Sequence, residues 1–277
     1  MAAAGSGEAQ EERIDMGFWK DADQKLQELL RLRTNPVAFK LLPEEEDLRK
    51  IEKMRRPGHQ VLFCQLVTAV RTYGMTLGAV EEDFMSPACP GMLGLSERPD
   101  YVMDGRFKGA FWFQDQKDAQ KYEKHFPVIP PKKGKAVALA PLRQEKFEPD
   151  MVLFYATPAQ MILAINGLQW KDYEPLQFYC VGEGACSDAV ARCYLTQKPS
   201  LSIPSYGERT YGHVAEDELA MAVPAWAMEK LIAGLEGLAK RGVCYPIPYT
   251  GSLADMTPGM PKVYQEMFKD RKKRRNP

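Results

Sequence analysis

Cysteine is the residue type in this sequence with the most chemistry to offer, because thiolates ligate soft metals, attack electrophiles and exchange electrons. The chain has 277 residues and six cysteines, at Cys64, Cys89, Cys180, Cys186, Cys193 and Cys244. None of them forms a CxxC pair, so the spacing of simple zinc or ferredoxin-type motifs is absent. Any site that several cysteines share must therefore be assembled by the fold.

The segment 182–195, GEGACSDAVARCYL, places Cys186 just ahead of a predicted helix. The positive end of the helix dipole lowers the pKa of a thiol there, and Ser187 fits the N-cap position. Gly182 and Gly184 allow the backbone to bend and to approach a ligand closely. Asp188 acts against a thiolate. The segment alone fits a reactive thiol, a metal-bound thiolate or an anion-binding loop, and equally a buried cysteine in a packed loop.

Cys89 is the second unusual cysteine, since it lies in SPACPGMLGL between Pro87 and Pro90. Such a stiff turn is found around metal and cluster ligands, although Cys-Pro alone is weakly specific. Cys64, in VLFCQLV near the start of a predicted helix, fits an inert core position on these grounds. Packing is also the expectation for the remaining cysteines, because free cysteine is usually buried.

The elements that would position these cysteines include two similar units. Residues 135–168 predict strand, turn, strand and helix, and residues 201–235 predict the same order 66 residues later. In the first unit, Thr157 and Gln160 fit a capping box ahead of the helix. Two ββα units predict a mixed or antiparallel sheet with helices on one face, an α+β fold.

Other segments complete the predicted order of elements. Periodicity and turn residues predict helices over 18–33, 55–74 and 114–126, and strands over 37–42, 75–80 and 107–113. Tyr206, Arg209 and Tyr211 lie in a predicted polar hairpin that could bind an anion or a ring. The three histidines form no metal-binding motif.

Composition limits the class of protein. Lys+Arg and Asp+Glu balance at 37 each, so no overall charge points to nucleic acid or a membrane surface. No stretch reaches the roughly 18 apolar residues of a membrane span, and the first residues lack the features of a secretory signal. We expect a cytoplasmic protein with a disordered tail over 1–16, a single domain over 17–268 and a basic tail over 269–277.

Several of these segments together resemble a known family. NPVAFK, VLFCQLVTAVRTYG, CPGMLGL, FEPDMVLFYATPAQ, GEGACSDAVARCYLTQKPSLSIPS and EDELAMAVPAWAMEKL are similar to the "archaeal cysteine-rich" (ArCR) family of archaea and bacteria, a domain of unknown function. The similarity runs from about Leu26 to Leu238. It implies no activity, but it singles out Cys64, Cys89 and Cys186 as the cysteines that give the family its name.

The resemblance changes the expectation for Cys64 from core residue to candidate ligand. Three thiolates from separate parts of the chain could converge on one iron–sulfur cluster and leave an iron position open. We therefore expect a redox or metal-linked protein of anaerobic metabolism, with Cys64, Cys89 and Cys186 as ligands. Gly182, Gly184 and Ser187 are expected to contact a cofactor, and a small molecule or a redox protein to be the partner.

Two other functions remain open from the sequence. In the first, the chain is a non-enzymatic small-molecule binding or scaffold protein whose cysteines are packed and whose 182–186 loop holds an anion. In the second, Cys186 alone is a nucleophile or redox-active thiol and no metal is bound.

Overall fold

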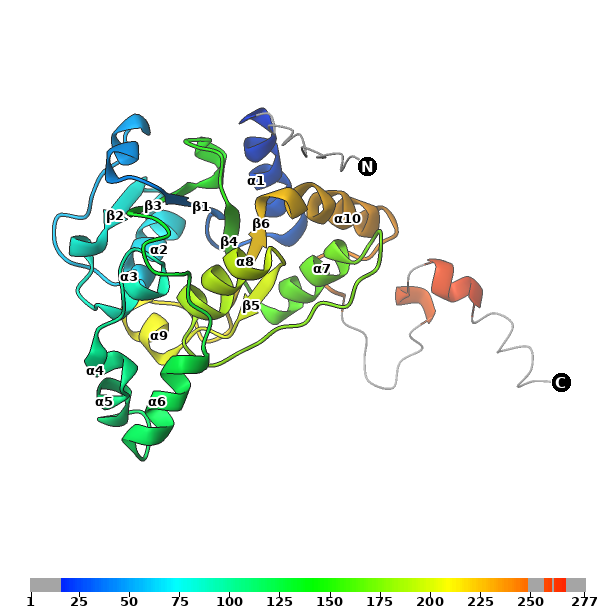
Figure 1. Ribbon diagram of the computed structural model, residues 1–277. Helices are drawn as coiled ribbons and strands as arrows, with labels where there is room; N and C mark the ends of the chain where they lie inside the picture. Colours follow the sequence, from blue (N-terminus) through cyan, green and yellow to red (C-terminus); the bar gives the residue numbers. More distant parts are fainter. Residues whose placement is uncertain (1–15, 249–256, 261, 268–277) are drawn as a thin grey trace, which may run out of the picture.

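A computed structural model describes residues 16–248, 257–260 and 262–267. The predicted terminal tails lie outside these ranges, apart from Met16, and their state stays a prediction. Six strands form one antiparallel sheet in the order β2-β3-β1-β4-β6-β5 (Figure 1). The strands are β1 (Val37–Leu42), β2 (Leu77–Val80), β3 (Ala136–Pro141), β4 (Met151–Ala156), β5 (Ser200–Ser202) and β6 (Leu219–Pro224). The predicted α+β class is confirmed, and the sheet is of the antiparallel kind.

Helices cover both faces of this sheet, so the prediction of helices on one face is wrong. The reason lies in the strands, which are apolar at successive positions: Phe39 faces one core and its neighbour Ala38 faces the other. In β4, Leu153 and Phe154 are divided in the same way. Because consecutive strand residues point to opposite faces, a strand that is apolar throughout needs cover on both sides.

The helices divide into two layers and a separate lobe (Figure 1). The helices are α1 (Met16–Leu30), α2 (Phe63–Tyr73), α3 (Ala88–Met92), α4 (Asp100–Met103), α5 (Arg106–Gly109), α6 (Gln116–His125), α7 (Pro158–Leu168), α8 (Arg192–Thr196), α9 (Tyr206–Gly212) and α10 (Met228–Lys240). A π-helical segment, η4 (Ala185–Ala191), runs directly into α8. Helices α1, α7 and α10 supply the core on one face of the sheet, and α2, α3 and η4 supply it on the other.

The two predicted ββα units exist, but they differ in their pairing. In the second unit β5 pairs directly with β6 before α10, whereas in the first unit β1 lies between β3 and β4. The capping box that begins α7 is confirmed: Thr157 accepts from the Gln160 backbone, and the Gln160 side chain accepts from the Thr157 N–H at 2.7 Å.

Two local predictions are wrong. Residues 107–113 were expected as a strand, yet they continue α5 into a series of turns, and the rings of Phe107 and Phe111 are in edge contact at 5.3 Å. Side chains four residues apart meet on a helix, so this spacing indicates helical structure. The aromatic residues of the segment favoured a strand instead, because such residues are common in strands. The expected hairpin at 206–211 is helix α9, which begins with a capping box between Ser205 and Glu208.

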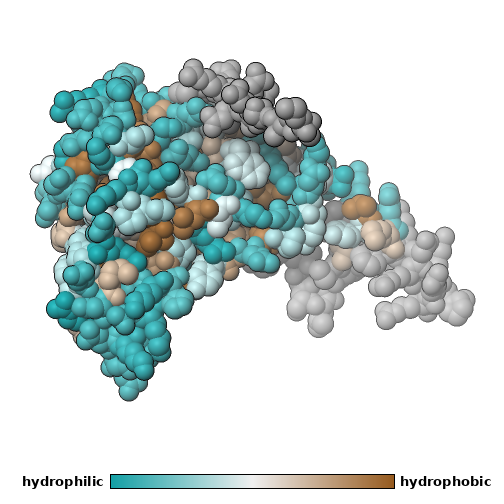
Figure 2. All heavy atoms as spheres, viewed as in Figure 1, coloured by the Kyte–Doolittle hydropathy of each residue, from teal (hydrophilic) through white to brown (hydrophobic). Residues whose placement is uncertain are grey.

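Helices α4, α5 and α6 form a lobe that extends from the sheet (Figure 1). The face of this lobe that Figure 2 shows is largely hydrophilic, and apolar side chains gather above it, toward the rest of the molecule. Within the described ranges, no helix combines the length and the apolar character that crossing a membrane requires.

Candidate functional site

Cys64, Cys89 and Cys186 line a single cavity of about 550 Å³, which we call the cysteine cavity. They reach it from α2, α3 and η4, three elements that are far apart in the sequence. The other residues that line it are Leu62, Phe63, Gln65, Met85, Ser86, Ala88, Met92, Phe107, Lys108, Phe111, Trp112, Tyr155, Gly182, Glu183, Ser205, Tyr206, Gly207, Glu208 and Tyr211. The fold therefore brings the three predicted cysteines together.

Each of the three cysteines is held by its own local structure. Cys64 is the second residue of α2, and the Gln65 side chain accepts from the Leu62 N–H at 2.8 Å to fix the start of that helix. Cys89 is buried in α3, the short helix that forms where a stiff Cys-Pro turn was predicted. Cys186 lies in the first turn of η4, with its Sγ 3.7 Å from the Met92 Sδ.

The loop that carries Cys186 is fixed by backbone geometry and by two buried carboxylates. Gly182 and Gly184 both have positive φ angles, 82° and 94°, which residues with a Cβ atom rarely adopt. Glu208 accepts from the Ala185 N–H at 2.9 Å, and Asp188 accepts from the Gly182 N–H at 3.1 Å. These bonds hold the cysteine at the cavity wall.

Of the three residues that were predicted to contact a cofactor, Gly182, Gly184 and Ser187, only Gly182 lines the cavity. Gly182 lines the cavity, while Gly184 packs against Glu208, whose Oε2 would lie 2.2 Å from a Cβ at that glycine. Ser187 is fully buried, and its hydroxyl donates to the Pro127 carbonyl at 2.7 Å, away from the cavity lining. It is also not the N-cap, a position that Gly184 occupies.

The expected lowering of the Cys186 pKa by a helix dipole is wrong. Burial, followed by the nearby Glu183 carboxylate and Cys89, raises the pKa of Cys186 well above its usual value. Burial and the neighbouring Cys89 raise the pKa of Cys64 to about 12, and burial raises that of Cys89 to about 11. All three thiols are therefore protonated at neutral pH when no metal is bound.

A buried polar network supports the cavity from behind. The Tyr155 hydroxyl donates to Glu208 at 3.0 Å, and the Arg71 guanidinium lies 4.2 Å from the centre of the Tyr155 ring. Arg71 also forms a buried ion pair with Glu218, with an N–O distance of 3.1 Å. Burial raises the pKa of Glu208 despite its hydrogen bonds. The network links α2, β4 and α9 beneath the thiols.

A second set of contacts joins the lobe to the loop of Cys186. Lys108 Nζ lies 2.7 Å from a Glu183 carboxylate oxygen, to which the Tyr122 hydroxyl also donates. Behind them, Arg98 pairs with the buried carboxylate of Glu123 at 3.1 Å. The cavity is thus bounded on one side by the body of the molecule and on the other by the lobe.

Sequence reasoning missed Glu183, Glu208 and Lys108 as cavity residues. A signal existed for Glu208, because Ser205 and Glu208 have the S-x-x-E spacing of a capping box.

The remaining cysteines differ from one another in burial. Cys193 is buried as expected. Cys180 and Cys244 are exposed, so packing was the wrong expectation for both.

Three thiols are the soft metal donors of the cavity. In the part of the chain that the structure describes, no three His, Cys, Asp or Glu side chains are grouped to hold a single metal ion. Three soft thiol donors nevertheless face a cavity much larger than one ion, and thiolates are the ligands that iron–sulfur clusters use. These three thiols are therefore the lining side chains that could hold a soft metal centre in this cavity.

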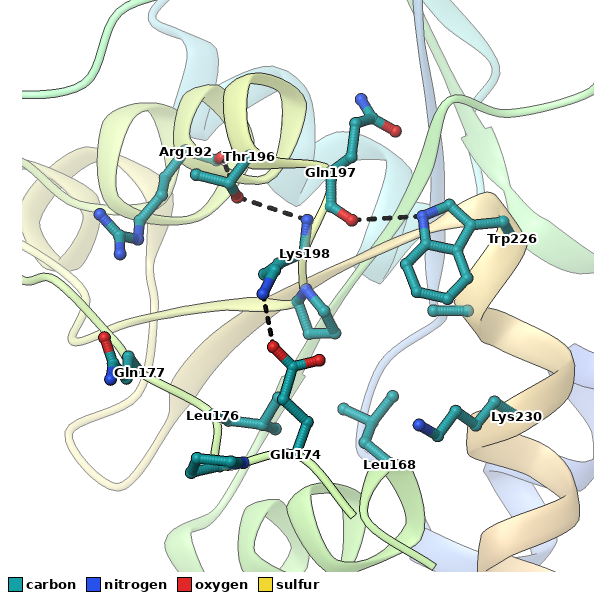
Figure 3. A pocket seen from close by; sticks show the side chains of 13 residues that line it. Leu168, Glu174, Leu176, Gln177, Arg192, Thr196, Gln197, Lys198, Trp226 and Lys230 are labelled. Carbon is teal, nitrogen blue, oxygen red and sulfur yellow. Dashed lines mark hydrogen bonds and ion pairs between the residues drawn. The ribbon is translucent and has the colours of Figure 1, made fainter. Parts of the chain in front are cut away.

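A second hollow of about 430 Å³ lies between α8 and α10, and we call it the tryptophan groove (Figure 3). Its lining comprises Leu168, Glu174, Pro175, Leu176, Gln177, Arg192, Thr196, Gln197, Lys198, Pro199, Trp226, Ala227 and Lys230. The Lys198 Nζ pairs with Glu174 at 2.5 Å, and the Trp226 ring N–H donates to the Gln197 carbonyl at 3.2 Å. Lys198, Glu174 and Trp226 are all more than half exposed.

Comparison with known proteins places the chain in a family. Residues 25–234 match the family described as "Uncharacterised ArCR", and the protein belongs to that family. A similar relative is an uncharacterised protein of Methanocaldococcus jannaschii, 22% identical over 240 residues, which cover 83% of this chain and 99% of that protein. No solved structure gives a significant match.

Proposed function

We propose that the protein binds an iron–sulfur cluster in the cysteine cavity, through Cys64, Cys89 and Cys186, and serves in redox or metal-linked chemistry. The observation that carries this proposal is the convergence of three cysteines from α2, α3 and η4 on one cavity. Sulfurs that ligate different irons of a cluster need not lie within reach of a single ion, which is consistent with the absence of a compact ion site among the described residues.

The chain's own residues would hold such a group in a defined way. The three thiols must lose their protons to become ligands, and their raised pKa values mean that binding releases protons. The positive charge of the metal centre offsets the cost of burying thiolates near Glu183 and Glu208. When bound, a cluster with three cysteine ligands supplies electron transfer, or a Lewis-acidic iron at its fourth position. A role in anaerobic metabolism stays a prediction.

The test is anaerobic reconstitution followed by iron and acid-labile sulfide analysis and an absorption spectrum. About one cluster per chain is expected for the wild type, and loss of cluster is expected in Cys64→Ser, Cys89→Ser and Cys186→Ser. Cys180→Ser is the matched control, because Cys180 is exposed and does not line the cavity. Iron and sulfide well below one cluster per chain would exclude the proposal.

A non-enzymatic binding protein with packed cysteines is the second candidate function. The raised pKa values of the three thiols favour it where no metal is bound.

The lone-thiol alternative predicts that Cys186 in the metal-free protein reacts first with iodoacetamide. We expect the opposite at pH 8: exposed Cys180 and Cys244 should be alkylated before Cys186, because burial keeps Cys186 protonated. Mass spectrometry of peptides sampled over time gives the order. Alkylation of Cys186 ahead of both exposed cysteines would support the lone thiol instead.

A further inference from the structure

Five aromatic side chains line one part of the cysteine cavity, and we call them the aromatic wall. They are Phe107, Phe111, Trp112, Tyr206 and Tyr211. Three edge-to-face contacts join four of these rings in series, with centroid distances of 5.3 Å, 6.2 Å and 6.2 Å. The last contact, between Trp112 and Tyr206, connects the lobe with α9.

The rings of the aromatic wall are exposed although they border a cavity. Phe111 is 61% exposed, Trp112 is 46% exposed and Tyr206 is 70% exposed. A single exposed ring is ordinary, but a contiguous group of large apolar side chains at a concave site usually marks a binding surface. A ligand that covered these rings would remove their apolar surface from water.

The charged groups of the cavity are already satisfied by the protein. Lys108 and Glu183 neutralise each other at 2.7 Å. The third group, Glu208, accepts hydrogen bonds from the Tyr155 hydroxyl and from the backbone N–H groups of Ala185 and Ser205. Among the described lining residues, no ionised side chain is left to pair with a charge on a ligand, so the cavity favours an uncharged one.

Sulfur atoms add a further preference. Met85, Met92 and the three cysteines line the same cavity as the rings. Thioether and thiol sulfurs make favourable contacts with aromatic rings, which aliphatic ligands cannot offer. The volume of about 550 Å³ lies within the usual range for small organic ligands.

We infer that the aromatic wall binds the ring of an uncharged aromatic small molecule and holds it beside Cys64, Cys89 and Cys186. The assignment rests on the proposed function in one respect: the aromatic molecule is the substrate class on which a cluster at those cysteines would act. Binding itself depends on different side chains from those that hold the cluster. The two can therefore be tested separately.

The test is fluorescence titration with N-phenyl-1-naphthylamine, an uncharged aromatic probe, using the full chain before and after cluster reconstitution. Saturable binding is expected, and Phe111→Ser/Trp112→Ser should weaken it by about tenfold, since two ring contacts are lost. Trp226→Ser is the control, because Trp226 is similarly exposed but lines the tryptophan groove. Far-ultraviolet circular dichroism checks folding. If the double variant does not fold, Tyr206→Ser replaces it, since Tyr206 is the most exposed ring of the wall.

Cysteine variants separate this inference from the proposed function. Cys64→Ser should lose the cluster and still bind the probe, whereas Phe111→Ser/Trp112→Ser should keep iron and sulfide and lose probe affinity. If the folded aromatic variant binds the probe as tightly as the wild type, the inference is overturned. It is also overturned if anionic 8-anilinonaphthalene-1-sulfonate binds the wall more tightly than the uncharged probe. A dimer that the aromatic variant abolishes, without any change in probe affinity, would assign the wall to a second copy of the chain.

Discussion

The cysteine cavity and the tryptophan groove are hollows of similar size, about 550 Å³ and 430 Å³, that hold their polar groups in opposite ways. Around the cavity, the ion pair between Arg71 and Glu218 is almost completely buried. In the groove, Lys198 and Glu174 form a pair in which both side chains are more than half exposed. Both pairs join a carboxylate to a cationic side chain, but only the pair of Arg71 and Glu218 is removed from water.

This difference determines what each hollow can do. Lys198 lowers the pKa of Glu174 in the groove, while burial raises the pKa of Glu208 in the cavity. An exposed pair is weakened by solvent and salt, and its members exchange partners easily. Groups held in a buried network keep one geometry, as a site that positions a reacting group requires.

The largest expected effect comes from breaking the buried pair. Arg71→Met leaves Glu218 without its partner inside the protein, so we expect the free energy of unfolding to fall by about 3–5 kcal/mol. Urea denaturation measures the change. Lys198→Met in the groove is the matched variant and should leave the unfolding free energy unchanged within error. Equal effects of the two substitutions would contradict the contrast between the two hollows.

A smaller effect is expected from the loop of Cys186. Gly184→Ala combines a φ angle of 94° with a Cβ that would lie 2.2 Å from Glu208 Oε2, so we expect a loss of about 1–3 kcal/mol. Gly182→Ala is the control, because its φ angle is also positive but no atom lies within 4 Å of the added Cβ. Its loss should be about 1 kcal/mol. If Gly182→Ala is the more damaging, close packing against Glu208 is not what fixes the loop.

The smallest effect concerns the pH dependence of stability. Burial and the Glu183 carboxylate raise the pKa of Glu123 from 4.5 to about 7. As the pH rises, Glu123 therefore loses its proton in the unfolded chain before it does so in the folded protein. The protonated Glu123 carboxyl contributes its full share to the free energy of unfolding below about pH 4.5, and this contribution is lost as the pH rises through 7.

Removing the Glu123 carboxylate should flatten this profile. In Glu123→Gln, the fall in unfolding free energy between pH 5 and pH 8 should be smaller than in the wild type by about 1–2 kcal/mol, less than the full pKa change implies because this pH range begins above the unfolded pKa of 4.5. Denaturation at four pH values measures it. Glu174→Gln is the control: since Lys198 lowers the pKa of Glu174, that carboxylate titrates below this range. A steeper profile in Glu123→Gln would contradict the assignment.

Much of the fold could be predicted because it depends on local signals. The capping box of Thr157 and Gln160 and the apolar runs of β3 and β4 identified their elements correctly. The pairing of strands could not be predicted, since β1 enters between β3 and β4 from a segment about 100 residues earlier. The helices on both faces follow from β3, β4 and β6, which are apolar along their whole length.

The site was predictable only in part. The convergence of Cys64, Cys89 and Cys186 was expected from the family resemblance and not from spacing. For the Cys186 thiol, the helix dipole and Asp188 gave opposing expectations, and neither its burial nor the position of the Glu183 carboxylate, which together raise its pKa, could be read from the sequence. Likewise, Trp112 and Tyr206 meet through tertiary contact between the lobe and α9, which no local pattern encodes.

The position of β1 has a consequence for how the chain acquires its structure. This strand pairs on both sides with partners that follow it by roughly 100 residues, so these contacts raise the contact order of the chain and its sheet should form slowly. During synthesis, an apolar strand emerges from the ribosome long before its neighbours and remains open to wrong pairing. Deleting residues up to 42 would remove a central strand of the sheet and leave β3 and β4 with two new unpaired edges.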